Sequence, residues 1–78
     1  MSELTTYQRR LLASLQGQAE AAAQNPLMYE PGLLVGTEHA RTPTADVLLR
    51  RGLVDQTVSP AGVRIIAINA AGRAALNV

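Results

Sequence analysis

Two segments rich in β-branched residues flank Ser59-Pro60-Ala61-Gly62, and this pattern constrains the fold more than any other feature of the chain. Proline and glycine occupy positions that a type I or type II turn favours, so residues 53–58 and 63–68 are predicted to form a β-hairpin. The apolar run from Ile65 to Ile68 breaks strict alternation. We expect Ile66 and Ile68 to point toward the core.

A helix is predicted in the N-terminal part of the chain, far before the hairpin in sequence. Thr5-Thr6-Tyr7-Gln8 has the T-x-x-Q form of a capping box, which indicates a helix that begins near Thr6. Leucines and alanines then recur at spacings of three, four and seven, as on one face of an amphipathic helix. Asn25-Pro26 is a firm stop, because proline cannot continue a helix.

Residues 26–36 are interpreted as a packed connection with a short strand or turn, and residues 37–41 as one or two helical turns. Thr42 is the predicted N-cap of a second clear helix over residues 43–51, with Pro43 in its first position. Gly52 is placed where a left-handed residue ends such a helix.

Asn69 is a suitable N-cap for a last short helix over residues 70–76. Nothing in the sequence marks a domain boundary, so residues 1–78 are treated as a single domain. Its most buried side chains are predicted to be Leu11, Leu15, Leu48, Leu53, Val54, Ile66 and Ile68.

Composition excludes several classes of protein. The 78 residues include no cysteine, one histidine and two aromatic residues, so neither a disulfide framework nor a closed zinc site is expected. No apolar run approaches the ~20 residues that span a bilayer, and Met1-Ser2-Glu3 lacks the features of a signal peptide. We therefore expect a cytoplasmic protein with a thin core, no cofactor and no membrane partner.

Catalysis is not expected either. Nucleophilic chemistry needs a base and an orienting group within reach, and the lone His39 has no recognisable motif around it. Phosphate-binding glycine motifs are also absent from the sequence. The chain is interpreted as a non-enzyme.

The run Leu48-Leu49-Arg50-Arg51-Gly52-Leu53-Val54, followed by the hairpin and by Asn69-Ala70-Ala71-Gly72-Arg73, resembles the C-terminal half of a winged helix-turn-helix domain. Small bacterial and phage regulators of the MarR and PadR type are similar over residues 42–76. The resemblance implies an α+β fold, a small winged helix-turn-helix with about three helices, a C-terminal two-stranded β-hairpin wing and a short terminal helix.

The resemblance also implies that residues 43–51 enter the major groove of duplex DNA while the hairpin contacts the backbone as a wing. All seven cationic side chains are arginines, which a GC-rich genome would also produce and whose guanidinium groups bind phosphates or carboxylates in a bidentate geometry. A homodimer would supply enough base contacts for specificity. The candidate DNA contacts are Arg41, Thr42, Thr44, Arg50 and Arg64.

A second function stays open, that of a protein–protein interaction module such as an adaptor or inhibitor. Net charge is only +1, the tip of the hairpin is uncharged, and Asp46 and Val47 lie on the outward face of the predicted helix. Arg50 and Arg51 have a structural alternative too, which is to complement the helix C-terminus or to pair with Asp55.

Overall fold

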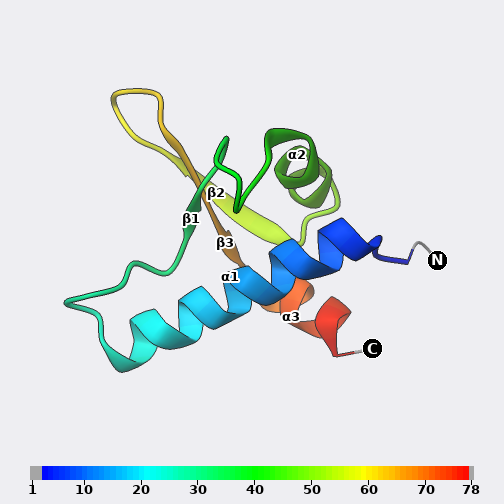
Figure 1. Cartoon of the computed structure of the whole chain (residues 1–78), viewed down its shortest axis with the longest axis horizontal. Helices are drawn as coiled ribbons and strands as arrows, with labels where there is room; N and C mark the ends of the chain where they lie inside the picture. The colour runs from blue at the N-terminus through cyan, green and yellow to red at the C-terminus, as the bar shows by residue number, and fades with distance from the viewer. Residues whose placement is uncertain (1–2, 78) are drawn as a thin grey trace.

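The computed structural model describes residues 3–77, which form three α-helices and one three-stranded antiparallel sheet (Figure 1). Met1 and Ser2, on which the expectation about the N-terminus partly rests, lie outside the described residues, as does Val78. The predicted α+β class is confirmed. In chain order the elements are α1 (Thr6–Gln24), β1 (Leu33–Leu34), α2 (Thr42–Arg50), β2 (Val54–Val58), β3 (Arg64–Ile68) and α3 (Ala70–Leu76).

Side-chain caps fix the starts of α1 and α3 as predicted. The Gln8 backbone N–H donates to Thr5 Oγ1, and the Thr5 N–H donates to Gln8 Oε1, both at 3.2 Å. At the start of α3, Asn69 Oδ1 accepts from the Gly72 N–H at 3.0 Å. α1 passes through Gly17 and ends before Asn25, which is its C-cap.

The start of α2 differs from the prediction by one residue. Thr42 is not the N-cap but the first helical residue, because the Ala45 N–H already donates to the Arg41 carbonyl at 2.9 Å. Arg41 takes the N-cap position with extended backbone and makes no side-chain capping hydrogen bond. At the other end, Gly52 has a φ of +73°, the left-handed conformation that glycine adopts without steric cost.

Residues 37–41 are not helical, which corrects the prediction for this segment. The Gly36 N–H donates to the Ala40 carbonyl at 2.8 Å, so the chain forms a tight turn. Thr37 Oγ1 accepts from the Ala40 N–H at 3.3 Å. Local bonding of this kind by a threonine side chain competes with helix formation.

The predicted hairpin is confirmed, and it belongs to a larger sheet. β2 pairs with β3 from Val54 opposite Ile68 to Val58 opposite Arg64, and the Ser59 N–H donates to the Val63 carbonyl at 2.9 Å. β1 pairs with the other edge of β3, which gives the strand order β1-β3-β2. We expected two strands, and the sheet has a third, the short strand β1.

The core lies between α1, α2 and one face of the sheet, and α3 packs against α1 and β3. Figure 1 shows α2 and α3 on different sides of α1. All seven residues predicted to be most buried are buried, including Ile66 and Ile68. Within residues 3–77, no helix combines the length and hydropathy that a membrane span requires.

Candidate nucleic-acid interface

The seven arginines divide into two groups by their bonding. Arg9 donates to the Leu76 carbonyl at 3.4 Å, Arg51 to Gln8 Oε1 at 2.9 Å, and Arg64 to Asp46 and Gln56. The other four side chains make no hydrogen bond or ion pair with any described residue. These four are Arg10, Arg41, Arg50 and Arg73.

The N-terminal end of α2 brings together three of the predicted contact residues, Arg41, Thr42 and Thr44. Arg41 and Thr42 are exposed and Thr44 is partly buried. The first N–H groups of a helix have no partner within the helix, and the positive end of the helix dipole lies there. Because Arg41 supplies no capping oxygen, this end of α2 is suited to an external anion.

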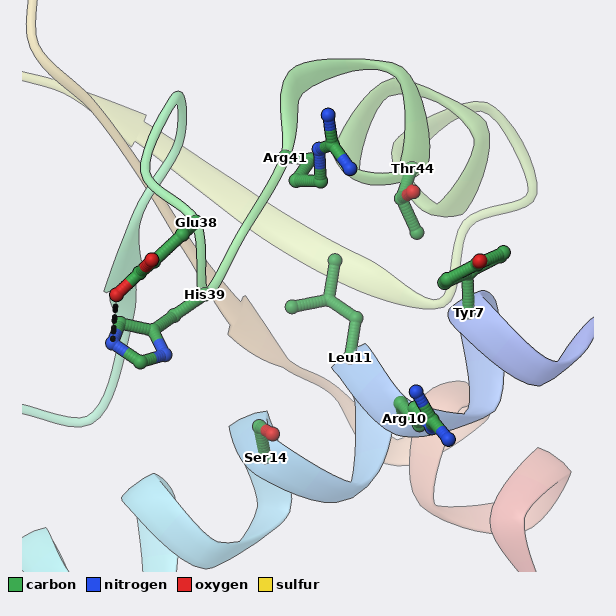
Figure 2. A pocket seen from close by; sticks show the side chains of 8 residues that line it. All are labelled: Tyr7, Arg10, Leu11, Ser14, Glu38, His39, Arg41 and Thr44. Carbon is green, nitrogen blue, oxygen red and sulfur yellow. Dashed lines mark ion pairs between the residues drawn. The ribbon is translucent and has the colours of Figure 1, made fainter.

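A pocket of about 320 Å³ lies between α1 and this end of α2 (Figure 2). We call it the α1–α2 pocket. The side chain of Leu11 separates Arg41 from Arg10 in Figure 2, so cations lie on two sides of an apolar side chain. Its lining residues are Tyr7, Arg10, Leu11, Ser14, Glu38, His39, Arg41 and Thr44.

Four residues of this pocket come from α1, and none of them was among the predicted contacts. Besides the buried Leu11, these are Tyr7, Arg10 and Ser14, whose i, i+3, i+7 spacing places them along one helical stripe. The spacing is visible in the sequence, but nothing local sets these residues apart from the other polar residues of α1. Only the packing of α2 beside that stripe distinguishes it from the rest of the exposed surface.

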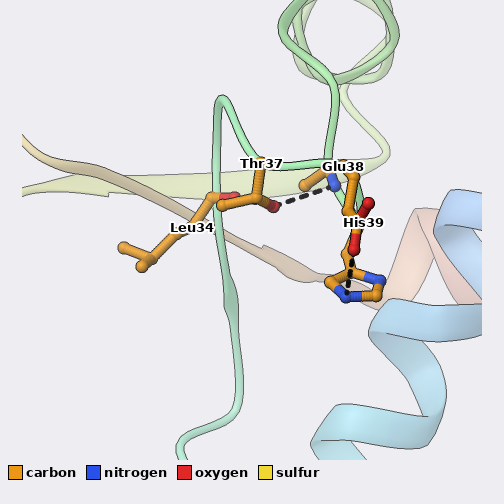
Figure 3. A network of polar contacts seen from close by, with 5 residues as sticks. Leu34, Thr37, Glu38 and His39 are labelled. Carbon is orange, nitrogen blue, oxygen red and sulfur yellow. Dashed lines mark hydrogen bonds and ion pairs between the residues drawn. The ribbon is translucent and has the colours of Figure 1, made fainter.

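The turn before α2 places His39 and Glu38 at the pocket's edge (Figure 3). Thr37 Oγ1 donates to the Leu34 carbonyl at 3.2 Å, which ties the turn to β1. His39 Nε2 lies 3.7 Å from Glu38 Oε1, and both side chains are exposed. A second open cavity of about 440 Å³ lies against Arg41 on the side of Thr42 and the turn.

The two remaining predicted contacts lie apart from this end of α2. Arg50 is exposed in the last turn of the helix. Arg64 lies on β3, where its Nη2 donates to Asp46 Oδ1 and its Nε donates to Gln56 Oε1, both at 2.6 Å. Among the described residues no arginine pairs with Asp55, the alternative considered for Arg50 and Arg51; the Asp55 carboxylate accepts from Asn69 Nδ2 at 3.3 Å.

Apolar surface is concentrated elsewhere on the molecule. The face of the sheet turned away from α1 carries an open groove of about 410 Å³ lined by Pro31, Gly32, Ile65 and Ala67, with Asp55 and Glu30 at its rim. Several large apolar side chains are also exposed. They are Leu27, Met28, Tyr29, Leu34, Val58 and Val63.

Within residues 3–77, no three His, Asp or Glu side chains are grouped closely enough to hold a metal ion. Comparison of the chain with protein-family models, curated proteins and solved structures finds no match.

Proposed function

We propose that this protein binds duplex DNA in the manner of a small winged-helix regulator, with α2 in the major groove and the β2–β3 hairpin as the wing. The strand order β1-β3-β2, with α2 between β1 and β2 in the chain, is compatible with that arrangement. Figure 1 shows the hairpin turn extending away from α1 and α3, where it is accessible to a long partner.

The observation that carries the proposal is the concentration of free donors at the start of α2. Arg41 and Arg10 have no acceptor within the described chain, and the first turn of α2 has no side-chain cap. DNA presents a regular array of phosphates, and arginine side chains and helix N-termini are frequent phosphate contacts. This end of α2 thus supplies the contacts that position a helix on the duplex.

Contacts along α2 then follow from which of its side chains are accessible. Arg50 is exposed at the far end of the helix and suits the O6 and N7 acceptors of guanine or a second phosphate. Asp46, an unfavourable neighbour for phosphates, is neutralised by Arg64. Arg64, the arginine of the hairpin, is consequently paired within the protein. The affinity for DNA then rests on Arg10, Arg41 and Arg50.

A titration of a labelled random-sequence duplex, followed by fluorescence anisotropy across about 50 to 200 mM salt, tests the proposal. Each phosphate neutralised contributes a slope of about −0.9 to the dependence of log affinity on log salt. We expect a slope of about −2.7, which corresponds to one phosphate for each of Arg10, Arg41 and Arg50. Absence of binding at the lowest salt would reject the proposal.

Binding to another protein is the second candidate, and a specific observation favours it. Leu27 is 99% exposed and is followed by exposed Met28 and Tyr29, in the connection between α1 and β1. Contiguous exposed apolar residues mark interaction surfaces in many proteins. If this function holds instead, Leu27→Ser abolishes partner capture, whereas Arg41→Gln leaves it intact and duplex binding is absent.

A further inference from the structure

The α1–α2 pocket differs from the rest of the surface in its combination of side chains. Two guanidinium groups, from Arg10 and Arg41, line it together with the hydroxyl-bearing Tyr7, Ser14 and Thr44. These groups come from α1, from α2 and from Arg41, the N-cap residue of α2. The packing of the two helices therefore creates the pocket. The pocket, of about 320 Å³, is open to solvent and has room for a phosphate group.

The arginines of the pocket differ from their neighbour Arg9 in their hydrogen bonding. Arg9, next to Arg10 in the chain, is directed toward α3, since it donates to the Leu76 carbonyl. Arg10 has no such bond, and neither does Arg41, although an arginine has five N–H donors. Both side chains are exposed, so their donors are available to an anion that enters the pocket.

We propose that the α1–α2 pocket is a sugar–phosphate site, in which Arg10 and Arg41 each contact a phosphate of one DNA strand. This inference rests on the proposed function and assigns the part of the DNA strand that Arg10 and Arg41 bind. The hydroxyl groups of Tyr7, Ser14 and Thr44 donate to the remaining phosphate oxygens. Bidentate arginine contacts fix the register of the strand against α2.

One acidic group lines the pocket, and its position is compatible with this site. Glu38 lies beside His39, 3.7 Å from its Nε2, and Figure 2 shows this pair on the other side of Leu11 from Tyr7 and Arg10. Its side chain is 88% exposed, so its charge is well screened by water and salt. The neighbouring imidazole offsets that charge further when it is protonated.

The test compares Arg10→Gln with Arg9→Gln in duplex titrations at several salt concentrations. The two substitutions remove the same charge from adjacent positions of α1, but only Arg10 lines the pocket. We expect Arg10→Gln to lower the salt slope by about 0.9 and to weaken binding about tenfold at low salt, and Arg9→Gln to leave the slope unchanged. Equal losses in both variants, or no loss in Arg10→Gln, would overturn the site while the wild-type protein still binds DNA.

Amide NMR spectra of the wild-type protein separate DNA from other sources of phosphate. Addition of the duplex should shift the signals of Tyr7, Ser14 and Thr44, and inorganic phosphate should shift the same signals more weakly. If inorganic phosphate shifts them while Arg10→Gln binds the duplex normally, the pocket serves a free phosphate and its place in the DNA interface is refuted. If the wild-type protein binds no duplex at all, the proposed function fails and this inference fails with it.

Discussion

Arg64 on β3 donates from Nη2 to Asp46 Oδ1 on α2 at 2.6 Å, and this ion pair connects the hairpin to the helix proposed to enter the DNA groove. The same guanidinium donates from Nε to Gln56 Oε1 on β2. The hairpin and the helix are therefore held in a fixed relative orientation. Because Arg64 is paired with Asp46, it is not free to bind a phosphate. The same pairing weakens the repulsion between Asp46 and a phosphate.

Asp46→Asn tests that relationship. Both side chains of the pair are partly exposed, so we expect the free energy of unfolding to fall by only about 0.5–1 kcal/mol. Duplex affinity should rise, because a carboxylate is removed and Arg64 becomes available to phosphates. Asp55→Asn on β2 is the matched control, and equal affinity gains in both variants would contradict the assigned role of Asp46.

Arg41→Ser separates stability from binding at the start of α2. Arg41 has the extended backbone of an N-cap but provides no capping oxygen, and serine provides one. We expect the free energy of unfolding to rise by about 0.5–1 kcal/mol while duplex affinity falls. Arg41→Gln, which removes the charge without adding a cap, should lower affinity alone. A stabilised Arg41→Ser with full affinity would exclude Arg41 from the interface.

Leu48→Ala probes the thin core beneath α2. Leu48 is fully buried, so its truncation should cost about 2–5 kcal/mol, enough to unfold so small a domain in part or completely. Leu34→Ala makes the same chemical change at an exposed position, and we expect less than about 0.5 kcal/mol there. Urea denaturation followed by circular dichroism measures both, and equal losses would show that the core is elsewhere.

Gly72 and Gly17 should respond to alanine in opposite directions. A Cβ on Gly72 would collide with the Leu53 carbonyl oxygen and lie 2.8 Å from Ile68 Cγ1, so Gly72→Ala should destabilise the packing of α3. A Cβ on Gly17 meets nothing within 4 Å, and alanine there should stabilise α1 by up to about 1 kcal/mol. Thermal melts of the two variants give the comparison, and a stable Gly72→Ala would mean that α3 is packed differently.

The parts of the fold that the sequence predicts are those with local causes. The capping box at Thr5 and Gln8, the Pro60–Gly62 turn and the Asn69 cap each act within a few residues, and each is confirmed. The turn over residues 37–41 was missed because the Thr37 hydroxyl replaces the helical bonding that the residue types also allow. β1 depends on pairing with β3, some thirty residues later, which no local pattern specifies.

The candidate site divides in the same way. Arg41, Thr42 and Thr44 were predicted from the resemblance to winged-helix domains, and they lie together at the start of α2. Arg10 and Tyr7 join them only through the packing of α1 on α2, which is a long-range contact. The pairing of Arg64 with Asp46 spans eighteen residues of chain and removes one predicted contact from those that are free. The number of arginines in the sequence does not show which of them are paired and which are free.

The most direct test of the central claim compares Arg50→Gln with Arg73→Gln in the salt dependence of duplex binding. Both side chains are exposed and make no hydrogen bond or ion pair with residues 3–77, but Arg50 ends α2 whereas Arg73 lies on α3, on another side of α1. If α2 is the DNA-contacting helix, Arg50→Gln lowers the salt slope by about 0.9 and Arg73→Gln leaves it unchanged. An unchanged slope in Arg50→Gln, or an equal loss in both variants, would contradict the claim.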